Sequence, residues 1–257
     1  MSIGDDFDPY APPKADTSPK RQSSGFGESA NFTVGDVLNR SWQILRSQLG
    51  LTIGATILYF VLGNLLAFFS GVVDDQSLKL ILSLANTIAT IFFQIGFFTF
   101  MLNLASGRDA KLADLFSGGP LIIPIFLASL LFGLVIMGAL IPAFLIGAIL
   151  GPIGILVALI YGLIAYVMIF TRLIQYYFLL IDREVGIVES LTLSSKLMKG
   201  KEIQFMSMSL MLLLINLCGL FALGLGLIIT VPLSFVCLAV YYLGITGQPV
   251  ADPFAMN

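Results

Sequence analysis

Few residues in this sequence could do chemistry. No histidine occurs among the 257 residues, which removes the commonest general base and metal ligand. Cys218 and Cys237 both fall inside apolar runs and are predicted to be small buried hydrophobes, not a disulfide or a metal cluster. There is no HExxH motif, and Asp74 and Asp75 lie in a polar break between apolar runs. We therefore expect no catalytic residue, no metal, no cofactor and no enzymatic activity.

Three uncharged polar residues lie well inside apolar runs: Asn86, Gln94 and Asn216. Between membrane helices such side chains form hydrogen bonds worth about 0.6–2 kcal/mol each. The alternative is that they line a polar pathway or contact a substrate, because polar residues inside a membrane often mark such routes.

Arg172 is the only formal charge in the apolar run 120–181 and lies near its end. Its long side chain could extend to the lipid headgroups. It could instead pair with Asp182 or Glu184, or bind an anionic lipid phosphate, so these alternatives stay open.

The segment 186–205, "GIVESLTLSSKLMKGKEIQF", is polar although it lies between two very apolar stretches. We predict an amphipathic helix over 186–200 at the membrane interface, with Lys196, Lys199 and Lys201 contacting anionic lipid. Each lysine near an anionic surface contributes about 1 kcal/mol. Ser194 and Ser195 interrupt the apolar face and are expected to contact protein. The alternative is a helix that merely connects two spans.

Composition places the chain in a membrane. Hydrophobic residues make up 58% and charged residues 11%, against about a quarter charged in soluble domains. The formal net charge of −2 gives no reason to expect nucleic-acid binding. The apolar runs are too long for transmembrane strands and predict helices; they cover 49–71, 78–106, 120–181 and 203–247.

The charges decide how many spans these runs contain. If 120–181 holds two spans, all Lys and Arg residues except Lys79 fall on one side, as the positive-inside rule requires. Three spans there would place the basic residues of 183–201 outside. We therefore predict six transmembrane helices, with both termini cytoplasmic and 141–154 as an outer turn. Its two prolines leave a short re-entrant piece as the alternative.

Shorter amphipathic segments precede the hairpins. Thr33 and Asp36 form a capping-box pattern, and a helix follows whose apolar stripe is predicted to be Val34, Leu38, Trp42, Leu45 and Leu49. A second short interfacial helix is expected within 108–118. Residues 1–31 and 248–257 are predicted to be disordered cytoplasmic tails around a helical domain at 32–247.

The stretch "RLIQYYFLL" followed by "DREVGIVESLTLSSKLMKGKEIQF", and then "LLLINLCGLFALGLGLIITVPLSFVCLAVYY", resembles the membrane domain of the glycerophosphoryl diester phosphodiesterase membrane-domain family. It is equally similar to related uncharacterised six-span bacterial membrane proteins. The resemblance covers about 32–247 and implies an all-α polytopic protein of the bacterial cytoplasmic membrane. Some family members also carry a soluble phosphodiesterase domain, for which the tails here are too short. We do not carry that activity over.

The sequence thus favours a non-catalytic integral membrane protein with a lipid-associated, scaffolding or accessory role and with membrane lipids as partners. The alternative is a carrier or channel for a small or lipidic solute. A water-accessible cavity lined by Asn86, Gln94 and Asn216 would favour the carrier, whereas a dry, solid bundle would favour the accessory role.

The charge distribution predicts the topology directly. Tags on both termini should be cytoplasmic, and the loop at Asp74 should face outward. A cysteine introduced at Asp75 should react with an impermeant thiol reagent from the outside. Labelling from the cytoplasmic side alone would contradict the predicted orientation.

Overall fold

The computed structural model describes residues 23–24, 32–183, 185–222 and 224–252. These residues are almost entirely helical. The helices are α1 (Val34–Ser47), α2 (Leu49–Val72), α3 (Gln76–Ser106), α4 (Ile122–Leu173), α5 (Tyr176–Arg183), α6 (Ile187–Met198), α7 (Glu202–Phe221) and α8 (Leu227–Thr246). Two 3₁₀ turns, η1 (Leu112–Phe116) and η2 (Gly119–Leu121), lie between α3 and α4, and two short strands, β1 (Ser23–Ser24) and β2 (Val250–Ala251), pair with each other.

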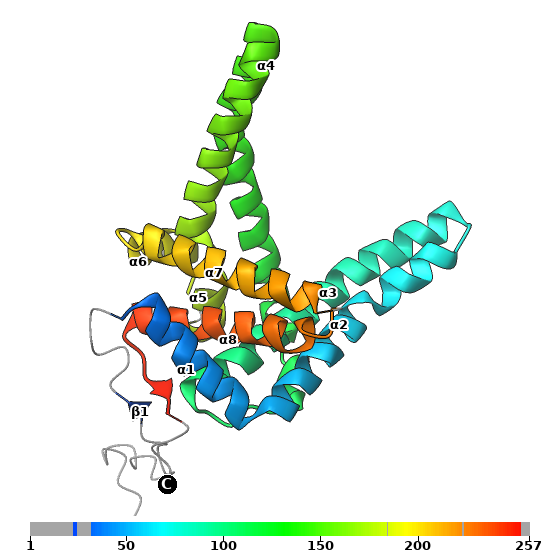
Figure 1. Ribbon diagram of the computed structural model, residues 1–257. Coiled ribbons are helices and arrows are strands. Elements are labelled where there is room, and N and C mark those ends of the chain that lie inside the picture. Colours follow the sequence, from blue (N-terminus) through cyan, green and yellow to red (C-terminus); the bar gives the residue numbers. More distant parts are fainter. Residues whose placement is uncertain (1–22, 25–31, 184, 223, 253–257) are drawn as a thin grey trace, which may run out of the picture.

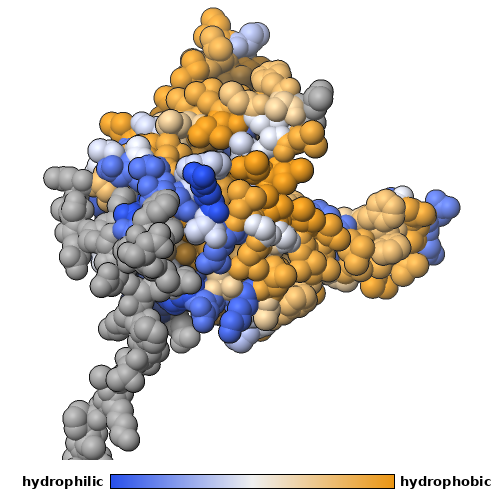
Figure 2. Space-filling model, turned by 60° about the horizontal axis from the view of Figure 1, so that its bottom comes forward, coloured by the Kyte–Doolittle hydropathy of each residue, from blue (hydrophilic) through white to orange (hydrophobic). Residues whose placement is uncertain are grey.

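Five helical stretches, those that contain α2, α3, α4, α7 and α8, are long and apolar enough to cross a membrane. Their side chains expose a broad hydrophobic surface. Hydrophilic residues gather around the terminal segments and again at the tip of the α2–α3 hairpin (Figure 2). This distribution is that of a multi-pass membrane protein.

Helix α4 is a hairpin of two helical arms that meet at Gly151. Gly151 has φ 59° and ψ −142°, a conformation that is essentially restricted to glycine. The chain reverses there, so that two antiparallel arms stand side by side (Figure 1). A Cβ atom on Gly162 would lie 3.4 Å from Leu140, which shows how closely the arms approach. The reversal falls inside the predicted outer turn at 141–154, and Pro142 lies within a helical arm.

The α2–α3 hairpin and the α4 hairpin project in different directions from a base across which α7 and α8 lie (Figure 1). The C-terminal half of α8 is the centre of that base, because Val236 to Ile245 are buried with the exception of Leu238, which is partly buried. Helices α1, α3 and α7 all pack on α8. Ring contacts reinforce the packing, such as Phe178 stacked on Tyr242 with 5.1 Å between centroids.

Helix α1 begins with the predicted capping box. The Thr33 N–H donates to the Asp36 carboxylate at 2.8 Å, and the Asp36 N–H donates to Thr33 Oγ1 at 3.2 Å. The backbone N–H of Thr33, and then its hydroxyl, lower the pKa of Asp36. The cap therefore stabilises the folded state fully at pH values above the ordinary carboxyl pKa. This stabilisation is lost as the pH falls through the lowered pKa of Asp36.

The buried face of α1 differs from the predicted stripe. Val37, Ser41, Ile44 and Leu45 are buried, whereas Trp42 is 42% exposed. The predicted and observed stripes are adjacent on the helix surface. Helix α1 packs on α8, and Ser41 is fully buried in the inner face of α1.

The C-terminal boundary also differs from the prediction. Val250 and Ala251 are buried, and Arg40 pairs with Asp252 at 2.9 Å. Residues 248–252, predicted to belong to a disordered tail, thus pack on the helices. The remaining tail residues, apart from the strand at 23–24, lie outside the described residues.

A glycine substitution tests the packing between α3 and η1. A Cβ atom on Gly96 would lie 2.2 Å from the Leu115 carbonyl oxygen, whereas nothing lies within 4 Å of one on Gly54. Gly96→Ala should lower the free energy of unfolding by about 1–3 kcal/mol or more. Gly54→Ala should leave it equal or raised, since Ala is the better helix former. SDS-induced unfolding followed by circular dichroism measures both, and equal stabilities would contradict this packing.

Candidate functional site

Four basic residues are predicted to bind lipid, and they lie at the end of α4, at the end of α6 and just before α7. We call Arg172, Lys196, Lys199 and Lys201 the basic cluster. Arg172 Nε pairs with Glu202 Oε1 at 3.1 Å. The partner is therefore Glu202 and not Asp182; Glu184, the other predicted candidate, lies outside the described residues. The sequence prediction considered only nearby acidic residues, whereas the fold brings the start of α7 against the end of α4.

Helix α6 is fixed to α4 by a buried serine. Ser194 Oγ donates to the Arg172 carbonyl oxygen at 2.9 Å, and Ser194 is fully buried. This confirms that Ser194 contacts protein. Ser190, Leu191 and Met198 complete the buried face. The helix spans Ile187–Met198, close to the predicted 186–200.

The three lysines have different surroundings. Lys196 and Lys199 are exposed and form no ion pair with any described residue. Lys201 is partly buried, with its Nζ 5.6 Å from the centroid of the Phe32 ring. Its carbonyl oxygen also accepts from the Tyr241 hydroxyl at 3.4 Å. Lys201 thus attaches the start of α7 to the base, and the two other lysines face outward.

The polar residues Asn86, Gln94 and Asn216 lie in three separate places. Asn86 Oδ1 accepts from the Ala67 N–H at 2.9 Å, inside the α2–α3 hairpin. Asn216 Nδ2 donates to Ser234 Oγ at 2.8 Å, inside the α7–α8 hairpin. These are hydrogen bonds between helices, the first of the two predicted roles. No described cavity is lined by all three residues.

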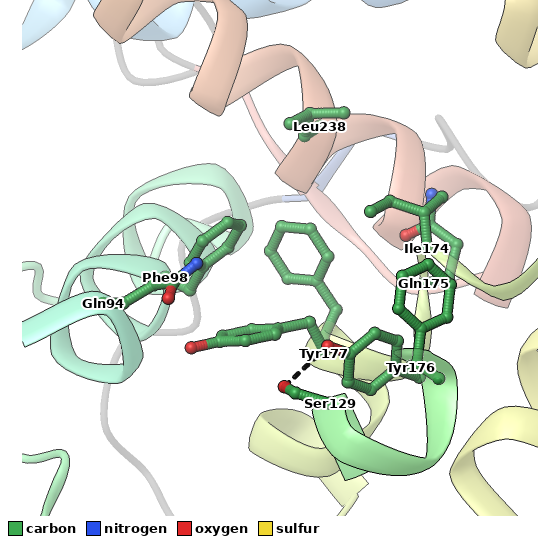
Figure 3. Close-up of a pocket in the computed structure, with 10 residues that line it drawn as sticks. Gln94, Phe98, Ser129, Ile174, Gln175, Tyr176, Tyr177 and Leu238 are labelled. Carbon is green, nitrogen blue, oxygen red and sulfur yellow. Dashed lines mark hydrogen bonds between the residues drawn. The ribbon is translucent and has the colours of Figure 1, made fainter. Parts of the chain in front are cut away.

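Gln94 lines a cavity of about 180 Å³ between α3, α4, the start of α5 and α8, which we call the tyrosine cavity. Figure 3 shows Gln94, Tyr177 and the Ser129–Tyr176 pair facing one another across it. The two hydroxyls of that pair are 2.9 Å apart. The lining residues are Gln94, Phe98, Ser129, Phe132, Ile174, Gln175, Tyr176, Tyr177, Phe178 and Leu238.

Two polar atoms in this lining have no partner among the described residues. They are Gln175 Oε1 and the Tyr177 hydroxyl. Gln175 is 1% exposed and Tyr177 is 8% exposed. A buried polar group without a hydrogen bond costs about 1–3 kcal/mol, so two such groups beside one cavity are unusual in a stable fold.

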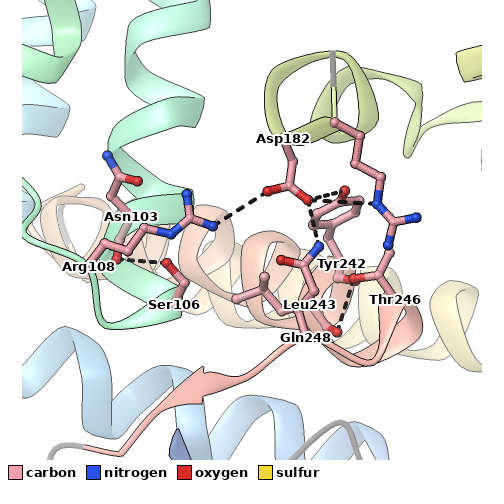
Figure 4. Close-up of polar contacts among 9 residues, drawn as sticks. Asn103, Ser106, Arg108, Asp182, Tyr242, Leu243, Thr246 and Gln248 are labelled. Atoms are coloured by element: carbon pink, nitrogen blue, oxygen red, sulfur yellow. Dashed lines mark hydrogen bonds and ion pairs between the residues drawn. The ribbon is translucent and has the colours of Figure 1, made fainter. Parts of the chain in front are cut away.

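A buried carboxylate, which sequence reasoning missed as a site, lies in the base. Asp182 Oδ2 accepts from the Tyr242 hydroxyl at 2.8 Å and from Gln248 Nε2 at 2.6 Å, and Oδ1 lies 3.5 Å from Arg108 Nη2 (Figure 4). Its side chain is 7% exposed. The only sequence signal was an aspartate directly after an apolar run.

This arrangement joins three parts of the chain that are distant in sequence. Arg108 follows α3, Asp182 lies in α5, Tyr242 lies near the end of α8, and Gln248 follows that helix. Both carboxylate oxygens are occupied, so the group is suited to hold the base together and not to act on a substrate.

No metal site is formed by the described residues, among which no group of three His, Cys, Asp or Glu side chains comes together. Comparison of the chain with protein-family models, with curated proteins and with solved structures returned no match. The resemblance to the phosphodiesterase membrane-domain family therefore rests on the sequence motifs alone.

Removing the buried carboxylate should destabilise the base. Asp182→Ala leaves the Tyr242 hydroxyl and the Gln248 amide without their acceptor, and we expect a loss of about 3 kcal/mol in the free energy of unfolding. Asp109→Ala, in an exposed loop position nearby, is the matched control and should be neutral. Unfolding in SDS followed by circular dichroism measures both. A loss no larger than that of the control would show that the carboxylate does not join the helices.

Proposed function

We propose that this chain is a non-catalytic, lipid-associated protein of a bacterial cytoplasmic membrane, with an accessory or scaffolding role. Counting the two arms of α4 separately gives six spans. The basic cluster and both termini then lie on the cytoplasmic side, in keeping with the positive-inside rule. Membrane lipids are its proposed partners.

The observation that carries this proposal is the composition of the surface at α6 and the start of α7. Lys196 and Lys199 are exposed there beside apolar side chains that are themselves exposed, Val188 at 64% and Ile203 at 80%. Cations beside an apolar surface suit the boundary between headgroups and acyl chains. The apolar part would enter the bilayer while the lysines meet the phosphates.

The alternative, a carrier or channel, has weaker support. A continuous polar route would need polar side chains that follow one another through the membrane. Asn86 and Asn216 instead use their amides within separate hairpins. Among the described residues, the tyrosine cavity is the one feature that favours a solute-handling role. It supports binding of a solute more than transport of a solute across the membrane.

Neutralising the two exposed lysines should weaken the retention of anionic lipid. Each contributes about 1 kcal/mol, so Lys196→Gln with Lys199→Gln should lower the affinity for phosphatidylglycerol by roughly tenfold or more at low salt. Native mass spectrometry of the full chain from mixed-lipid nanodiscs would measure the bound lipid.

Two controls sharpen this experiment. Lys79→Gln removes the same charge at the far tip of the α2–α3 hairpin and should leave cytoplasmic-side lipid unchanged. Lys201→Gln should reduce stability more than lipid binding, because Lys201 lies over the Phe32 ring. If the double variant retains phosphatidylglycerol as the parent does, α6 is only a connector.

A further inference from the structure

We propose that the tyrosine cavity binds an uncharged, hydroxyl-bearing group, supplied either by a free polyol or by a neutral lipid. This site is separate from the proposed role of the basic cluster and shares no residue with it. Four features of the cavity point to such a ligand: its size, its unpartnered polar atoms, its lack of charged residues and its aromatic walls.

The cavity is much larger than a single water molecule requires. A cavity needs about 10–15 Å³ of probe-occupied volume for one water molecule, and this one measures about 180 Å³. It therefore has room for a small organic group or for several waters. A purely apolar cavity would stay dry, but this one has hydroxyl and amide groups in its wall.

The unpartnered atoms define what the ligand must offer. Gln175 Oε1 is an acceptor and needs a donor, whereas the Tyr177 hydroxyl can donate or accept. An alcohol group can meet either kind of partner, because its oxygen accepts while its proton is donated. The Ser129–Tyr176 pair and the Gln94 amide add further polar contacts on the other walls.

The charge and the shape of the cavity lining narrow the class of ligand further. None of the described residues that line the cavity is ionisable as an acid or a base near neutral pH, so a charged ligand would lose its hydration without gaining a counter-ion. Phe98, Phe132 and Phe178 provide flat apolar walls that suit the C–H groups of a polyol or the glyceryl part of a lipid.

Neighbouring tyrosines give a matched pair of variants. Tyr176 has a hydrogen-bond partner in Ser129, whereas Tyr177 has none. In the ligand-free protein, Tyr176→Phe should lower Tm by roughly 2–4 °C, as expected for the loss of one hydrogen bond. Tyr177→Phe should leave Tm equal or raise it, because it removes a buried polar atom that has no partner.

The binding experiment uses the full chain in dioleoylphosphatidylcholine nanodiscs. One arm adds a small fraction of dioleoylglycerol to the lipid, and the other adds free glycerol to the buffer. Tm is followed by circular dichroism, and bound dioleoylglycerol is counted by native mass spectrometry. Either probe, if it binds the folded state, should raise Tm, and which probe acts identifies the source of the hydroxyl.

The variants decide whether any effect belongs to this cavity. Tyr177→Phe and Gln175→Leu should each reduce the affinity for the active probe by at least tenfold, while the lysine variants of α6 should bind it normally. The proposal is overturned if neither probe raises Tm, or if Tyr177→Phe binds the probe as the parent does. A Tyr177→Phe protein that melts well below the parent would also contradict it, since the hydroxyl would then have a structural partner.

Discussion

The structure depends on one constraint: inside a bilayer, a polar group must find its hydrogen-bond partner within the protein. Along its helices the chain satisfies many polar side chains with backbone carbonyls that are close in sequence. Thr52 and Thr56 return their hydroxyls to carbonyls one turn earlier. Thr90 donates to the Gly63 carbonyl at 2.9 Å and so links α3 to α2. Hydrogen bonds of this kind let three hairpins with mostly apolar surfaces carry scattered polar residues.

The same constraint explains the polar contacts where the hairpins join, and it draws attention to the cavity that remains between them. Asp182 is buried because Tyr242, Gln248 and Arg108 surround its carboxylate. The few other unpartnered atoms in the described residues, Ser41 Oγ, Asn216 Oδ1 and Thr230 Oγ1, do not line the described cavities. Gln175 and Tyr177 differ from them because both border the same cavity, which is why we assign a ligand there.

Much of the architecture could be predicted from the sequence because long apolar runs and loop charges carry that information. The reversal inside 141–154, the break before Leu227 and the α6 boundaries follow from glycines, prolines and polar residues. Contacts between distant segments could not be predicted. Nothing local indicates that Arg172 pairs with Glu202, that Asp182 meets Tyr242, or that Ser41 is buried while Trp42 is exposed. These depend on how the hairpins meet at α8.

The tyrosine cavity could not be predicted either, because its lining residues come from four separate parts of the chain, and neither Gln94 nor the stretch RLIQYYFLL indicates that they meet. The most direct test of its role is a cryo-electron microscopy map of the full chain in lipid nanodiscs, at a resolution that shows side chains. The account predicts non-protein density within hydrogen-bond distance of both the Tyr177 hydroxyl and the Gln175 amide. A cavity closed by its own side chains, with those two groups bonded to protein, would contradict it.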